Sequence, residues 1–135
     1  MREQDRQRFQ ALEEAAIQGA ASTLKSLLLL NGGACVALLA FIGSTATSDK
    51  LRPNFVPLVE ASVQSLGSFA VGAGIAVFAM VTAYLTNHHY ANSLIDPENT
   101  RWGVGSVMFT LTSMLTLFSL ALFGKGIYLI WESMP

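Results

Sequence analysis

The fold is decided by residues 61–95, ASVQSLGSFAVGAGIAVFAMVTAYLTNHHYANSLI, which contain no Asp, Glu, Lys or Arg. A hydrocarbon core of about 30 Å is crossed by roughly 20 helical residues, at about 1.5 Å of rise per residue. Two further uncharged stretches, Ser26–Ser48 and Trp102–Gly124, also reach that length. The sequence therefore predicts an all-α integral membrane protein with three transmembrane helices.

The chain is predicted to be a single membrane domain, because 135 residues with 52% hydrophobic and 13% charged side chains leave no room for a soluble one. The expected segments are a cytoplasmic amphipathic helix over 1–24, spans over about 26–46, 64–86 and 104–124, and an interfacial segment over 125–135. The N-terminal helix contains no proline and should run unbroken into the first span. Its apolar side is formed by Phe9, Leu12, Ala16, Ala20 and Leu24.

The second and third helices are predicted to form a tight antiparallel hairpin. Pro57 suits the first turn of the second helix, which can extend to about Leu94. The connection after it is short, with Asp96 as a cap and Pro97 as the first residue of the third helix.

The composition excludes several classes of function. The net charge is −1 and the eight Lys and Arg are scattered, so a basic face for nucleic acid is absent from the sequence. The single cysteine, Cys35, cannot form an intrachain disulfide. No nucleophile with a base, intramembrane carboxylate pair or phosphate loop can be assembled, so we expect neither an enzyme nor a cofactor.

The orientation is predicted from basic residues near the ends of the spans. An N-terminus in the cytoplasm places five of them on that side and three on the other, which favours this orientation. The cytoplasmic set is Arg2, Arg6, Arg8, Lys25 and Arg101, and the opposite set is Lys50, Arg52 and Lys125.

Small residues predict where the helices pack, because lipid-embedded helices associate by close backbone approach. The second helix has a continuous seam of small residues: Ser65, Ser68, Gly72, Ala76, Ala79, Ala83 and Thr86. Its larger residues, among them Phe69 and Phe78, are expected on the remaining surface. The first helix has a shorter seam of Gly33, Ala37, Ala40 and Ser44. Because one chain offers few ways to bury every seam, we expect a homo-oligomer.

Hydroxyl residues cover about half of the third helix, and we expect this half to face protein or water. Its candidate pore-lining or interhelical residues are Ser106, Thr110, Ser113 and Thr116. Packing is the simpler interpretation, since Ser and Thr can bond to the carbonyl one turn back. Asn31 is the one strongly polar side chain in the first span, and it is predicted either to form an interhelical hydrogen bond or to line a pore.

The remaining titratable residues lie near the predicted ends of the spans. His88 and His89 diverge by about 100° on a helix, so one chain cannot chelate a metal with both. They are candidates for a pH-sensitive ring or for a solvated helix end. Lys125, Tyr128 and Trp131 are predicted to form an interfacial anchor.

The run Leu27-Leu28-Leu29-Leu30-Asn31-Gly32-Gly33-Ala34, continuing to Phe41, resembles the first span of small, uncharacterised bacterial inner-membrane proteins. The resemblance covers this span and, loosely, the three-helix layout. It implies a multi-pass protein of the bacterial inner membrane and carries no activity with it.

Two functions remain as hypotheses. The first is a small homo-oligomeric pore or membrane-permeabilising effector, suggested by many small and hydroxyl residues without catalytic groups. The second is a non-conducting scaffold or accessory subunit whose N-terminal helix binds a soluble or membrane protein. The lipid bilayer and other copies of the chain are the expected partners of both.

Overall fold

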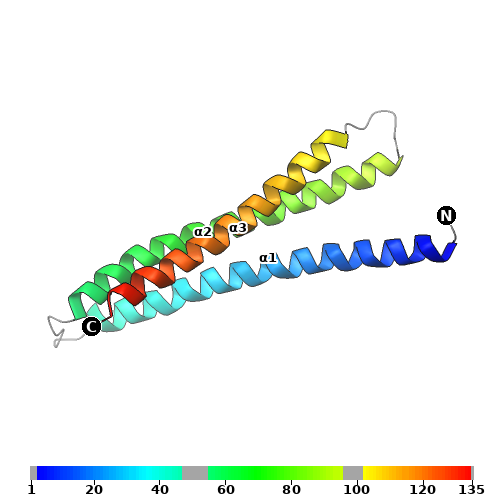
Figure 1. Ribbon diagram of the computed structural model, residues 1–135. Coiled ribbons are helices and arrows are strands. Elements are labelled where there is room, and N and C mark those ends of the chain that lie inside the picture. Colours follow the sequence, from blue (N-terminus) through cyan, green and yellow to red (C-terminus); the bar gives the residue numbers. More distant parts are fainter. Residues whose placement is uncertain (1–2, 47–54, 96–101, 135) are drawn as a thin grey trace.

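The computed structural model describes residues 3–46, 55–95 and 102–134. These residues form three long helices, α1 (Glu3–Ala46), α2 (Val56–Ile95) and α3 (Trp102–Glu132) (Figure 1). Each contains a segment long and apolar enough to cross a bilayer: Gln10–Ala46, Val56–His88 and Gly105–Glu132. The prediction of an all-helical chain with three long apolar helices is confirmed for the part of the chain described.

The helices are longer than one bilayer crossing requires. At about 1.5 Å per residue, the 44 residues of α1 extend over about 66 Å and the 40 residues of α2 over about 60 Å. α1 is one unbroken helix, as predicted, and Pro57 lies in the first turn of α2. The predicted cap at Asp96 and helix start at Pro97 lie outside the described residues.

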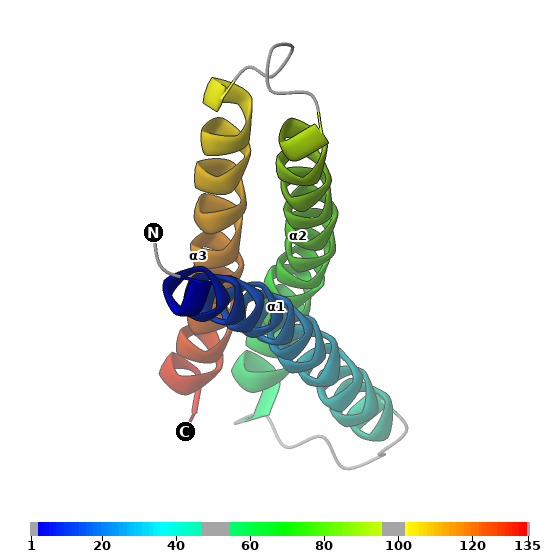
Figure 2. The same cartoon turned by 90° about the vertical axis from the view of Figure 1, so that its right-hand side faces the viewer.

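The antiparallel hairpin of α2 and α3 is the main packing unit. These two helices contact each other most extensively, whereas α1 packs chiefly on α2 and touches α3 little. α1 lies against the half of the hairpin that contains the start of α2 and the end of α3, then diverges toward its own N-terminus (Figure 1). Figure 2 shows that α1 crosses the hairpin obliquely.

The register of the hairpin repeats every seven residues. Ser65 Oγ donates a hydrogen bond to Gly126 O at 2.9 Å, and one heptad further Ser119 Oγ donates to Gly72 O, also at 2.9 Å. Continued along the sequence, the same step would pair Ala79 with Thr112 and Thr86 with Gly105, and of these four residues all but the partly buried Thr112 are buried. Because a seven-residue repeat keeps one seam facing a partner helix, small residues line the contact along most of its length.

A side chain predicted on the surface belongs to this core. Phe69 is only 2% exposed, and its ring lies 5.3 Å from that of Phe123, between centroids. The prediction for Phe69 is therefore wrong, whereas Phe78, assigned to the same surface, is exposed. The reason is Gly126, whose missing side chain leaves the space that the Phe69 ring fills.

Candidate functional site

All three helices meet at a buried polar cluster of Asn31 from α1, Gly72 from α2 and Ser119 from α3, here called the Asn31 cluster. Asn31 and Ser119 are each 0% exposed. Asn31 Nδ2 donates to Leu27 O at 3.0 Å and to Ser119 Oγ at 3.4 Å, and Ser119 Oγ in turn donates to Gly72 O. The cluster thus joins α1 to α3, which α1 otherwise hardly contacts.

Gly72 has no side chain, and the Asn31 carboxamide occupies the space that a side chain there would fill. A Cβ atom at Gly72 would overlap Asn31 Oδ1 and lie 3.0 Å from Asn31 Cγ. Asn31 Oδ1 has no hydrogen-bond partner within the described part of the chain. A larger residue at position 72 would therefore displace the carboxamide.

Asn31 lies on the face that α1 turns to the hairpin. Leu24 and Leu27, on the same side of α1, are 3% and 6% exposed. Further along, Cys35 Sγ lies 3.9 Å from Leu66 O of α2. Of the two alternatives for Asn31, the structure has the interhelical hydrogen bond, and the side chain lines no outer surface of the chain.

The small-residue seam predicted in α1 faces away from the hairpin. Gly33 and Ala37 are exposed, and a Cβ atom at Gly33 would meet nothing within 4 Å. Ala40 and Ser44 are exposed as well, and Ser44 Oγ donates to Phe41 O at 2.8 Å. The α2 seam is different. Gly72, Ala76 and Ala79 are buried, and Ser68 and Ala83 are partly buried.

The hydroxyl residues of α3 divide between two faces. Thr112 and Ser119 face α2, where Thr112 Oγ1 is 2.9 Å from Thr82 Oγ1. Ser106 and Thr110 are exposed, and Ser113 and Thr116 are partly buried. Four hydroxyls of α3 donate to the carbonyl one turn back, at distances of 2.8 to 3.0 Å: Thr110, Thr112, Ser113 and Thr116.

The residues predicted near the ends of the spans lie on outer surfaces. His88 is exposed and stacks on Tyr84, with ring centroids 6.2 Å apart. The side chain of His89 lies outside the description. Lys125 is exposed, as are Tyr128 and Trp131, which are 60% and 72% exposed. Within the described residues, no group of three His, Cys, Asp or Glu could hold a metal ion.

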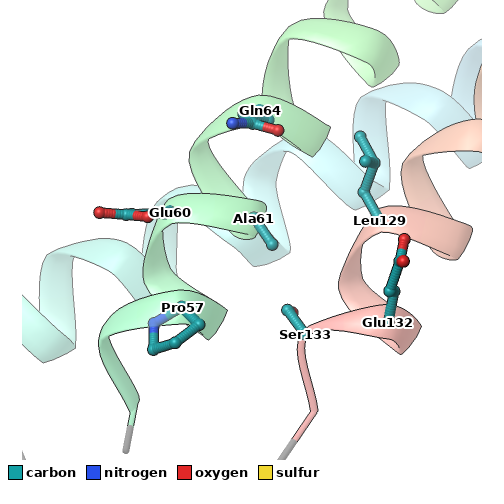
Figure 3. A pocket seen from close by; sticks show the side chains of 7 residues that line it. All are labelled: Pro57, Glu60, Ala61, Gln64, Leu129, Glu132 and Ser133. Carbon is teal, nitrogen blue, oxygen red and sulfur yellow. The ribbon is translucent and has the colours of Figure 1, made fainter. Parts of the chain in front are cut away.

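An open depression of about 240 Å³ lies between the start of α2 and the end of α3. Its polar lining includes Glu60, Gln64 and Glu132. Figure 3 shows the Glu60 carboxylate directed away from α3, so the two carboxylates do not converge on one point. The depression therefore lacks the geometry of a cation site.

Sequence reasoning identified Asn31 and Gly72 but did not bring them together. It placed Ser119 only among the hydroxyl residues of the third helix expected to face protein or water, and it did not single out Gly126. The missed signal is the spacing of Gly105, Thr112, Ser119 and Gly126, one small residue every seven along α3. The same period in Ser65, Gly72, Ala79 and Thr86 indicates the partner helix. Comparison with known proteins adds no assignment, because no family model, curated protein or solved structure matches the chain.

Proposed function

We propose that the chain is a multi-pass protein of the bacterial inner membrane, with its N-terminus in the cytoplasm. The positions of two lysines relative to the Asn31 cluster support the placement in a membrane. α1 and α3 run in the same direction (Figure 1), so Lys25, six residues before Asn31, and Lys125, six residues after Ser119, lie on opposite sides of the cluster. Six residues rise about 9 Å, so a cluster at the middle of a core about 30 Å thick leaves both long side chains able to reach the headgroups.

In that membrane, copies of the chain associate into a small pore. The observation that carries this proposal is the outward direction of small and hydroxyl residues that the chain does not use in its own packing. Gly33 and Ala37 on α1 and Ser106 and Thr110 on α3 are exposed, although residues of the same kinds are buried between α2 and α3. Small faces allow helices of neighbouring chains to approach closely, and hydroxyls tolerate water at the lumen.

Purified protein in liposomes is expected to release ions or a small dye. Replacing three hydroxyl residues together, Ser106→Ala, Thr110→Val and Ser113→Ala, should lower the release several-fold, because an apolar lumen is harder to wet. The matched control replaces Val107→Ile and Leu111→Ile, on exposed positions of the same helix. Oligomers that release neither ions nor dye at any voltage or pH would contradict the pore.

The scaffold remains a second candidate because of the N-terminal half of α1. Every residue from Gln10 to Thr23 is exposed, including Leu12 at 71% and Ile17 at 43%. The next residue, Leu24, is buried against the hairpin. α1 therefore has a helical arm that its own chain leaves uncovered and that a second protein can bind.

Deleting residues 2–23 separates the two functions while retaining Leu24. A pore should keep its conductance, since residues 10–23 of the deleted arm are all exposed. A scaffold should lose the proteins that purify with it from its membrane and should release no dye before or after the deletion. Dye release and partner recovery measured on the same preparations distinguish these outcomes.

A further inference from the structure

Two opposite faces of α1 are suited to helix packing, and the structure uses the less usual one. Gly33 lies two residues from Asn31, so it projects about 200° away from Asn31 on the helix. Close helix contacts in lipid generally select small residues. α2 and α3 follow this rule with Gly72, Ala79 and Gly126, whereas α1 turns Leu24, Leu27 and Asn31 inward and Gly33 outward.

The Asn31 carboxamide explains this choice if hydrocarbon surrounds the chain. With α1 rotated by half a turn, the small face would meet α2 and Asn31 would point into lipid, where an unpaired carboxamide is costly. In the structure the same group donates to Ser119 Oγ and fits over Gly72. One polar residue in an apolar helix contact is known to select one arrangement among several of similar packing quality.

We infer that Asn31 is the positioning residue that sets the rotation of α1 on the hairpin, with Gly72 as its receptor, and so keeps the Gly33 face turned outward. The fit to Gly72 is one of shape, because Oδ1 occupies the place of a Gly72 side chain, and the carboxamide donates its hydrogen bond across helices to Ser119 Oγ. Residues 72 and 31 should therefore behave as a matched pair. Enlarging residue 72 is harmful only while residue 31 retains its carboxamide.

The rotation of α1 can be measured with the native Cys35, which faces α2 near Leu66. A second cysteine is placed at Ser68, one turn from Gly72 on the same face of α2. Oxidation in liposomes should form a disulfide within one chain, which protects both thiols from PEG-maleimide in the denatured protein. Gly72→Ala should slow this reaction about tenfold, because overpacking at the cluster displaces α1.

The decisive variant combines Gly72→Ala with Asn31→Ala. Removing the carboxamide removes the overlap, so adding Gly72→Ala to Asn31→Ala should cause no further loss of oxidation rate. Gly74→Ala is the matched control, since a Cβ there meets nothing within 4 Å, and it should leave the rate unchanged. Equal rates in Gly72→Ala and the unchanged background would overturn the inference, as would a loss from Gly72→Ala that is as large in the Asn31→Ala background as in the native one.

Asn31→Leu tests the rotation without overpacking at Gly72. It removes the polar group that keeps this face of α1 turned inward. The rate of disulfide formation between Cys35 and the cysteine of Ser68→Cys should therefore fall. In a Cys35→Ser background, a cysteine at Ala37 should then start to react with the cysteine at position 68 of the same chain. Without Asn31→Leu, a cysteine at Ala37 should cross-link between copies of the chain, and only this expectation rests on the proposed oligomer. If the cysteine at Ala37 reacts within its own chain as described but cross-linked dimers never form, the proposed oligomer is refuted and the role of Asn31 stands.

Discussion

A Val71→Asp variant is expected to lose stable insertion of α2. Val71 is 55% exposed and lies beside Gly72, at the level of the Asn31 cluster. On the proposed placement this level is the middle of the bilayer, where an aspartate costs about 3 kcal/mol on insertion scales. On a surface in contact with water, the same change would alter stability by less than about 0.5 kcal/mol. Val71→Asp is therefore expected to have a large effect if hydrocarbon surrounds this position and a small one if water does.

Insertion of α2 can be measured by placing a glycosylation acceptor on each side of the helix and comparing which is modified in microsomes. Gln64→Glu is the control, because it adds the same charge at an exposed position near the start of α2, beside Glu60. This control should insert normally, since a carboxylate near a helix end reaches the interface. If Val71→Asp inserts as well as Gln64→Glu, or leaves the protein folded in a detergent-free soluble fraction, hydrocarbon does not surround this position.

The helices themselves could be predicted from the sequence because their cause is local. Three uncharged stretches of spanning length, one unbroken N-terminal segment without proline and Pro57 at a helix start determine α1, α2 and the body of α3. The α2 seam was predictable for a related reason. Gly72, Ala76 and Ala79 repeat at helical spacing, and small residues mark close approach wherever a second helix is available.

The partner of each face could not be predicted, because it depends on residues distant in the sequence. Phe69 is large and was assigned to the surface, yet Gly126, on another helix, makes room for its ring. The small face of α1 is turned outward because Asn31 finds Ser119 and Gly72 on two other helices. A helical wheel shows which residues share a face, but it does not show which of two good faces has the better receptor.

The contact between Phe69 and Gly126 leads to the second large effect, a loss of stability in Gly126→Ala. A Cβ atom at position 126 would lie 2.6 Å from both Cε1 and Cζ of the Phe69 ring. The ring is buried and lies against Phe123, so it has little room to move. Overpacking of this kind costs about 1 to 3 kcal/mol. Thermal unfolding of the detergent-solubilised protein should shift accordingly to lower temperature.

Two further variants distinguish overpacking from a general effect of alanine in α3. Gly124→Ala, two residues away, meets nothing within 4 Å and should stabilise the helix by up to about 1 kcal/mol, the usual gain in helix propensity. Phe69→Leu replaces the ring with a shorter side chain. The double variant with Gly126→Ala should therefore be more stable than the sum of the two separate losses predicts. Additive losses in that double variant would mean that the Phe69 ring does not occupy the space beside Gly126. The close contact between α2 and α3 would then need another explanation. The hydrogen bond from Ser65 Oγ to Gly126 O lies at the same glycine.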